Sequence, residues 1–287
     1  MKINKFLSIF FLILTFFVGA SFHKYKIFPF GLGLFSLSTQ IIEKKPKLNK
    51  ENDKLNSTNK DLDYKIFKDI VFTNNTYEVN FDLIKVPIEQ YNDNIRLGGY
   101  LEKINKSEIL FLSPCGEYHI LNLDNYKFQK KIYKLDKKIN EKFDLFCKDN
   151  AGIKDILKFN DEYYISTNLI DNSGKKYIGI VRYSLINNQL IFKDLFFKTN
   201  GYPSAGSLQS GGRIVAFKDH LLFSIGDFGN INKVQQDDTF LGKIVKIDPY
   251  TKKYQIYSKG HRNPQGLFYD ISNDIIIETE HGPMGGD

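Results

Sequence analysis

Residues 260–287 read GHRNPQGLFYDISNDIIIETEHGPMGGD and contain two polar loops beside short apolar runs. In the first loop, residues 262–265, a cation and two amides surround Pro264. The proline ring fixes its own φ and keeps Asn263 out of the α region, so the polar groups point in set directions. A second apolar run leads into the loop at residues 280–283, which contains Gly and Pro. Two such loops next to short strands predict a preformed polar pocket.

The same stretch resembles the soluble PQQ-dependent sugar dehydrogenases, the family of glucose/sorbosone and aldose sugar dehydrogenases. The resemblance covers about the last hundred residues well and the region from about 95 to 200 loosely. An eight-residue near-identity in the expected order with four other motifs is specific, whereas a lone GGR is not. The matching motifs are SGGRIV at 210–215, FSIGD at 223–227, QDDTFLGKIVKID at 236–248, GHRNPQGL at 260–267 and TEHGPMGGD at 279–287.

A repeat runs through the folded part of the chain, and its last two units overlap these motifs. Each unit pairs a Gly-led apolar run with a second, more apolar run, and polar turn residues lie between the two. The second runs start at residues 108, 162, 220 and 274, which are 54, 58 and 54 residues apart. Short β-rich runs, tight turns and a period near fifty, without sustained helical periodicity, predict an all-β protein made of propeller blades.

The resemblance implies a six-bladed β-propeller of the quinoprotein sugar dehydrogenase type. The four repeats would supply about four blades within a partial propeller at residues 70–287. We therefore expect either a C-terminally truncated chain or missing blades that come from elsewhere. The blades are predicted to be antiparallel and four-stranded, with the Gly-led runs as inner strands. These runs begin at Gly99, Gly152, Gly212 and Gly266.

Loops that precede inner strands should meet at one mouth of the central channel. Gln209 precedes Gly212 and Arg262 precedes Gly266, so we predict that Gln209 and Arg262 face each other there. The resemblance implies PQQ with a Ca²⁺ ion at this place, and hydride transfer from the C1 of a sugar to the quinone. An external electron acceptor would then reoxidise the cofactor. The implied cofactor-binding residues are Arg262, Asn263, Gln265 and His281, and the implied calcium ligands are the carbonyls of Gly282 and Pro283.

The catalytic residues depart from the family pattern at one position. Family members carry a general-base histidine shortly before the Gly-Arg of the GGR motif, and Gln209 stands there instead. An amide accepts no proton at neutral pH. By resemblance, Asp227 matches a carboxylate that orients the missing histidine, and Asp227 could itself replace the base. The alternative is a catalytically silent propeller of the same family that binds a ligand or a protein.

Each of these residues also has a structural interpretation. Arg262 could only tie two loops together, and His281 could be an ordinary loop histidine. Asp227 could form an Asx turn after its strand. Glu280 could bind calcium or accept bonds from backbone N–H groups at the end of a strand.

The N-terminus predicts export. Lys2 and Lys5 precede an apolar run at residues 6–22, in which Val18-Gly19-Ala20 offers small residues for cleavage. Residues 1–22 are therefore either a signal peptide or a retained membrane anchor, and residues 23–69 are a polar linker. We expect a periplasmic or membrane-tethered protein.

Charge and cysteines add two further expectations. The net charge of +7 comes from scattered lysines without a basic helix or patch, so nucleic acid is not expected as a partner. Cys115 and Cys147 are the only cysteines. In an exported protein they could form a disulfide, or they could both be free and buried. No His/Cys metal cluster is evident in the sequence.

Overall fold

The computed structural model describes residues 66–73, 78–84, 99–125, 127–129, 131–147, 151–201 and 209–282. The expected signal or anchor at residues 1–22 lies outside these ranges. The first strand, β1 (Ile66–Thr73), starts inside the segment expected to be linker and pairs with β2 (Glu78–Ile84). Within the described residues, no helix is both long and apolar enough to cross a membrane.

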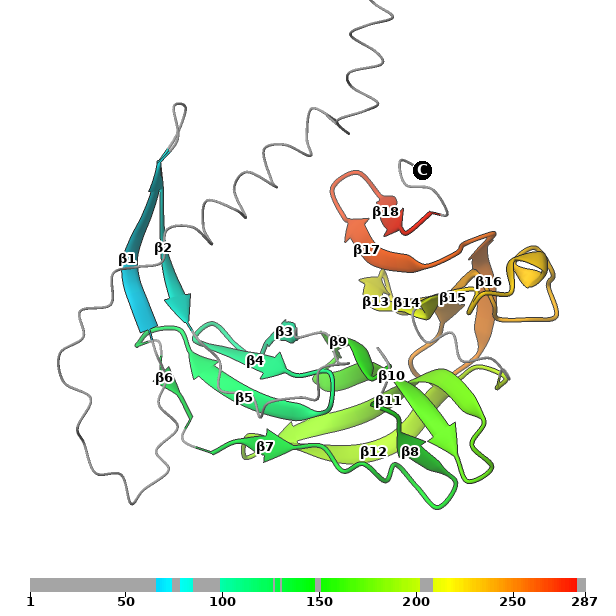
Figure 1. Cartoon of the computed structure of the whole chain (residues 1–287), viewed down its shortest axis with the longest axis horizontal. Coiled ribbons are helices and arrows are strands. Elements are labelled where there is room, and N and C mark those ends of the chain that lie inside the picture. The colour runs from blue at the N-terminus through cyan, green and yellow to red at the C-terminus, as the bar shows by residue number, and fades with distance from the viewer. Residues whose placement is uncertain are drawn as a thin grey trace, which may run out of the picture. The chain divides into compact units, whose positions relative to one another are not determined.

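Antiparallel sheets make up the rest of the described chain, as the sequence predicts (Figure 1). The first sheet contains β3 (Tyr100–Lys103), β4 (Glu108–Leu112), β5 (Glu117–Asn122), β6 (Lys127–Phe128) and β7 (Tyr133–Lys134). The second contains β8 (Phe143–Leu145), β9 (Ile153–Phe159), β10 (Glu162–Asp171), β11 (Lys176–Ile186) and β12 (Gln189–Lys198). The third contains β13 (Gly211–Phe217), β14 (His220–Ile225), β15 (Lys243–Ile247) and β16 (Tyr254–Lys259), and β17 (Pro264–Asp270) pairs with β18 (Ile275–Glu280).

The prediction of four-stranded blades is confirmed for the third sheet and wrong for the first two. The third sheet has the order β13-β14-β15-β16. In the first sheet β6 and β7 both pair with β5, and in the second sheet β8 and β9 both pair with β10. In each of these sheets, two short strands therefore pair with different parts of one neighbouring strand, where a four-stranded blade would have a single strand. Cys147, which follows β8, is bonded to Cys115.

The Gly-led runs form the strands that adjoin one another across sheets. β3, β9 and β13 each lie at one edge of their sheet and begin at or next to the expected glycines. β9 packs beside both β3 and β13, and β13 packs beside β17. This is the arrangement of inner strands in a propeller, so the predicted placement is confirmed for these three runs. The fourth strand, β17, begins at Pro264 and not at Gly266.

Two-residue turns define the strand registers. Phe159 pairs with Glu162, and the turn between them has positive φ at Asn160 (49°) and Asp161 (60°). Asn187 and Asn188 make the same kind of turn between β11 and β12. Such turns match the right-handed twist of the strands, and Asn and Asp tolerate this backbone region.

The middle sheet is buried on both faces. Tyr163 and Ile165 of β10 pack into a core shared with Leu110 and Leu112 of the first sheet. Tyr164, on the opposite face of β10, packs into a second core with residues of the third sheet such as Phe223. Alternate residues of one strand therefore join three sheets into one hydrophobic body.

A disulfide joins the first two sheets. Cys115, in the turn after β4, is bonded to Cys147, after β8, and the Cα atoms lie 5.4 Å apart. The question that the sequence left open is therefore decided in favour of a bridge.

We expect the double variant Cys115→Ser/Cys147→Ser to lose about 3–4 kcal/mol of unfolding free energy, because a bridge across 32 residues restricts the unfolded chain. Urea unfolding measures this loss. Reducing agent should lower the midpoint of the wild type and leave that of the variant unchanged. Equal stability of the two proteins under oxidising conditions would contradict this expectation.

Asp171 closes the hairpin between β10 and β11. Its Oδ1 accepts bonds from the backbone N–H groups of Ser173 and Lys175, both at 2.9 Å, and its Oδ2 accepts the Tyr177 hydroxyl at 2.7 Å. Side-chain hydrogen bonds from Ser173 and Tyr177 lower the pKa of Asp171 to about 2.

Asp171→Asn should therefore lower the melting temperature above the ordinary pKa of Asp, where the folded state favours the charged form. The difference from wild type should shrink as the pH falls from about 4 towards 2, because both states of the wild type then bind the proton. Thermal unfolding across this range measures the effect. Asp238→Asn is the matched control, because the Asp238 carboxylate makes no hydrogen bond within the described residues. A pH-independent difference would contradict the assignment.

Candidate functional site

Three adjoining edge strands carry a bulge where they meet. The register shifts at Lys154 in β9, at Gly212-Arg213 in β13 and at Gln265 in β17. A bulged residue leaves the hydrogen-bond ladder, so its peptide groups need other partners.

Ser224 of β14 supplies partners for the bulge in β13. Its Oγ accepts bonds from the N–H groups of Gly212 (3.2 Å) and Arg213 (2.9 Å), and it donates to the carbonyl of Pro264 at 3.0 Å. Gly212 has a φ of 110°, and a Cβ there would overlap the Lys154 side chain. Only glycine therefore fits at this point, where β13 lies closest to β9.

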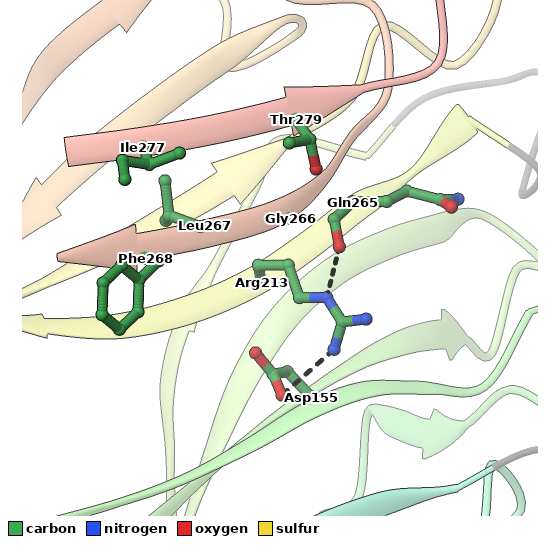
Figure 2. A pocket seen from close by; sticks show the side chains of 8 residues that line it. All are labelled: Asp155, Arg213, Gln265, Gly266, Leu267, Phe268, Ile277 and Thr279. Carbon is green, nitrogen blue, oxygen red and sulfur yellow. Dashed lines mark hydrogen bonds and ion pairs between the residues drawn. The ribbon is translucent and has the colours of Figure 1, made fainter. Parts of the chain in front are cut away.

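Arg213 links the bulges of both neighbouring strands (Figure 2). Its Nε donates to the carbonyl of Gln265 at 2.6 Å, and its Nη1 lies 3.3 Å from both the Lys154 carbonyl and Asp155 Oδ1. The guanidinium also lies over the Tyr100 ring of β3, 5.3 Å from its centroid. One side chain thus contacts edge strands of three other sheets.

A cavity of about 450 Å³ opens beside this arginine. Burial raises the pKa of Asp155, and the bonds that it accepts from Ile214 N and Arg213 oppose that rise. No sequence motif pointed to Asp155, and the GGR motif was the only signal for Arg213. The lining residues are Asp155, Arg213, Gln265, Gly266, Leu267, Phe268, Ile277 and Thr279.

Four loops containing most of the predicted site residues meet nearby. Asp227 N donates to the carbonyl of Arg262 at 2.8 Å, and Phe228 N donates to the carbonyl of Gln209 at 3.1 Å. Gly211 N donates to Asn263 Oδ1 at 3.2 Å. These bonds join segments that lie far apart in the sequence, as predicted for the loops that precede inner strands.

Glu280 holds the Arg-Asn loop in place. Its Oε2 accepts bonds from the backbone N–H groups of Arg262 (2.7 Å) and Asn263 (3.1 Å). Its interpretation as an acceptor of backbone N–H groups at a strand end is therefore confirmed. Glu278 lies two residues earlier on β18, where burial and then the Glu280 carboxylate raise its pKa to about 7.

The Arg262 guanidinium points to the last described residues of the chain. Its Nη1 donates to the carbonyls of His281 (2.7 Å) and Gly282 (3.0 Å). The structural interpretation, an arginine that ties two loops together, is therefore confirmed. Within the described residues, its Nε and Nη2 make no hydrogen bond, so these donors remain available. The His281 side chain is exposed and makes no hydrogen bond with this part of the chain.

Asp227 is buried and forms the expected Asx turn. Only 2% of it is exposed, and its Oδ1 accepts the N–H of Gly229 at 2.8 Å. Burial raises the pKa of Asp227, and the positive charge of Arg262 partly offsets this rise. The carboxylate therefore belongs to the same electrostatic environment as the Arg262 loop.

Two predicted residues lie apart from this cluster or outside the described part. Gln265 lines the cavity beside Arg213 (Figure 2), whereas Asn263 is buried against Gly211. Pro283 lies outside the described residues. No hydrogen bond joins Gln209 to Arg262 within the described chain, so their opposition across a channel mouth stays a prediction.

The chain is similar in sequence to known proteins. The sequence model of the glucose/sorbosone dehydrogenase family matches residues 122–287. An uncharacterised protein of Synechocystis is 34% identical over 112 residues, covering 30% of this chain and 27% of the relative. The aldose sugar dehydrogenase YliI of Escherichia coli is 32% identical over 91 residues, covering 27% and 24%. The matched part thus spans about a quarter of each of these curated relatives.

Solved structures show the fold. The apo-form of the soluble aldose sugar dehydrogenase of Escherichia coli has a TM-score of 0.54 at 21% identity, covering 66% of this chain and 58% of that one. The PQQ-bound form of aldose sugar dehydrogenase from Streptomyces coelicolor has a TM-score of 0.50 at 21% identity, covering 64% and 56%. The antiparallel sheets described above are those of a β-propeller.

We expect Arg213→Met to cost about 2–3 kcal/mol of unfolding free energy, because it leaves the half-buried Asp155 carboxylate and two backbone carbonyls without their partner. Lys259→Met is the matched control. It removes an exposed ion pair with Asp237 and should cost about 0–1 kcal/mol. Urea unfolding measures both values. Equal losses in the two variants would show that Arg213 does not hold the edge strands together.

Proposed function

The chain belongs to the glucose/sorbosone dehydrogenase family, and we propose that it takes part in PQQ-dependent oxidation of a sugar at C1. We further propose that its sheets are blades of a six-bladed propeller. The observation that carries the proposal is the loop cluster around Arg262. There the Arg262 guanidinium donates to two backbone carbonyls through Nη1, and its Nε and Nη2 make no hydrogen bond within the described residues. The loop that carries it is bonded to Asp227 and Glu280.

The donor set fits PQQ, a planar quinone that carries carboxylates. Arg262 would hydrogen-bond the quinone through its remaining donors and stabilise negative charge on it. Asn263 would hold the loop through Gly211, and His281 would contact the edge of the cofactor. Bound PQQ would supply a two-electron acceptor for the hydride that leaves sugar C1.

Calcium fits the same place by donor chemistry. Backbone carbonyl oxygens are calcium ligands, and we assign this role to Gly282 and Pro283. In the structure the Gly282 carbonyl accepts a bond from Arg262 at 3.0 Å. A cation there would repel the guanidinium at short range, so calcium binding requires Arg262 to turn away from Gly282.

Proton transfer is the step for which this chain lacks the usual residue. As hydride leaves C1, the sugar hydroxyl proton needs an acceptor, and the Gln209 amide is not one. Asp227 adjoins Gln209 through the Phe228–Gln209 hydrogen bond, and its raised pKa makes it a stronger base than an ordinary Asp. Its burial, however, restricts access to substrate. Gln209 therefore favours the second candidate function, a propeller that binds a ligand or a protein without turnover.

We also propose that the protein is exported, and is either periplasmic or tethered to a membrane by its N-terminal segment. Lys2, Lys5 and the apolar run that follows support this location. The Cys115–Cys147 bridge supports it as well, because disulfides persist in oxidising compartments. The proposed partners are a sugar and an external electron acceptor.

We expect Arg262→Ala to weaken PQQ binding about tenfold or more in the calcium-loaded protein, because a charge-assisted hydrogen bond contributes about 1.5–3 kcal/mol. Calorimetry with PQQ measures this effect. Lys233→Ala removes an exposed lysine outside the cluster and is the matched control.

Gln209→His should raise sugar-dependent dye reduction, because it supplies a base with a pKa near 6.5.

Each outcome separates the two functions. Wild type that binds PQQ and turns over sugar identifies another base, with Asp227 as the candidate. PQQ binding without turnover, restored by Gln209→His, identifies a lapsed dehydrogenase. If calcium-loaded wild type binds no PQQ, the dehydrogenase proposal is wrong and the binding propeller remains.

A further inference from the structure

Three metal-ligating side chains meet beside the Arg262 loop. A nitrogen of His261 and a carboxylate oxygen from each of Glu278 and Glu280 all lie within 4.8 Å of one another. His261 Nδ1 is 4.0 Å from Glu280 Oε1. His261 lies in the loop between β16 and β17, and both glutamates lie on one face of β18.

In two of these side chains, His261 and Glu280, the ligand atom that does not face the cluster has its own hydrogen-bond partner. His261 Nε2 lies 2.8 Å from Ser258 Oγ, which leaves the Nδ1 lone pair facing the carboxylates when Nε2 carries the proton. Glu280 Oε2 accepts the two backbone N–H groups of the Arg262 loop, which leaves its Oε1. Hydrogen bonds to their outer atoms therefore orient two of the three ligands, as in protein metal sites.

An orphaned oxygen provides an independent observation. Glu278 Oε1 is buried, yet it has no hydrogen-bond partner among the residues that the structure describes. Such an oxygen beside a second carboxylate is unfavourable unless a proton or a cation lies between them, and the His261 nitrogen beside both carboxylates suits a metal ion. The Lys243 ammonium donates to the carbonyls of Val234 and Leu241, both at 2.7 Å, and makes no ion pair with either glutamate within the described residues.

We propose that His261, Glu278 and Glu280 bind a divalent transition-metal ion of the zinc type. Bonds of about 2.0–2.2 Å place tetrahedral ligand atoms about 3.4 Å apart, so small side-chain rotations would close the site. Three protein ligands leave a fourth position for water. The imidazole nitrogen favours zinc over calcium, which takes oxygen ligands. The ion would tie the loop before Arg262 to β18, and its binding does not depend on the proposed dehydrogenase function.

The test is calorimetry with ZnCl₂ on the full chain, produced without a polyhistidine tag and freed of metal by a chelator. We expect one Zn²⁺ per chain with micromolar or tighter affinity, unchanged by excess Ca²⁺, and a rise in melting temperature on binding. Glu278→Gln keeps the shape of the side chain and should weaken binding at least tenfold, as should His261→Ala. Thermal unfolding without metal shows whether the variants are folded.

Asp274→Asn is the matched control, because it removes an exposed carboxylate at the tip of the same hairpin. It should bind Zn²⁺ as wild type does. The proposal is overturned if wild type binds no Zn²⁺, if Glu278→Gln binds it equally well, or if Ca²⁺ displaces it. None of these measurements uses PQQ or sugar, so loss of the metal site and loss of the dehydrogenase function would be seen separately.

Discussion

The meeting of edge strands from different sheets depends on Arg213. Bulges in β9 and β17 release the carbonyls of Lys154 and Gln265 from their ladders, and Arg213 donates to both. A planar guanidinium presents several donors in fixed directions, which a lysine could not do. Both carbonyls at the strand junction thereby gain a hydrogen-bond donor.

The position of the loop cluster around Arg262 depends on this strand junction. Ser224, which supports the bulge that carries Arg213, also donates to the carbonyl of Pro264 in the middle of the Arg-Asn-Pro-Gln loop. Gly226 lies so close to the Gln209 carbonyl that a Cβ would overlap it. A shift of this strand junction would therefore move Arg262 and Gln209 together. The geometry of the loop cluster is thus coupled to the packing of the strands that support it.

Glu280 separates two chemically different regions. Through Oε2 it orients the loop in which Arg262 faces backbone carbonyls, a set of groups suited to anions and hard cations. Through Oε1 it faces His261 and Glu278, a mixed nitrogen and oxygen set suited to a borderline transition metal. One carboxylate at the end of β18 thus links the loop that we assign to the quinone with the group that we assign to a metal ion.

Much of the fold and part of the site were predictable from residues near one another in sequence. The all-β content, the second runs starting at Glu162 and His220, and the family resemblance all followed from alternation, turn residues and motifs, because these are local constraints on φ and strand length. The split strands, the partners of Arg213 and the group around Glu278 did not follow. They depend on bulges, on a disulfide and on contacts such as Arg213 to Lys154, 59 residues apart. A repeat period shows which strands recur but not the register at which they meet, and only the packed sheets decide that register.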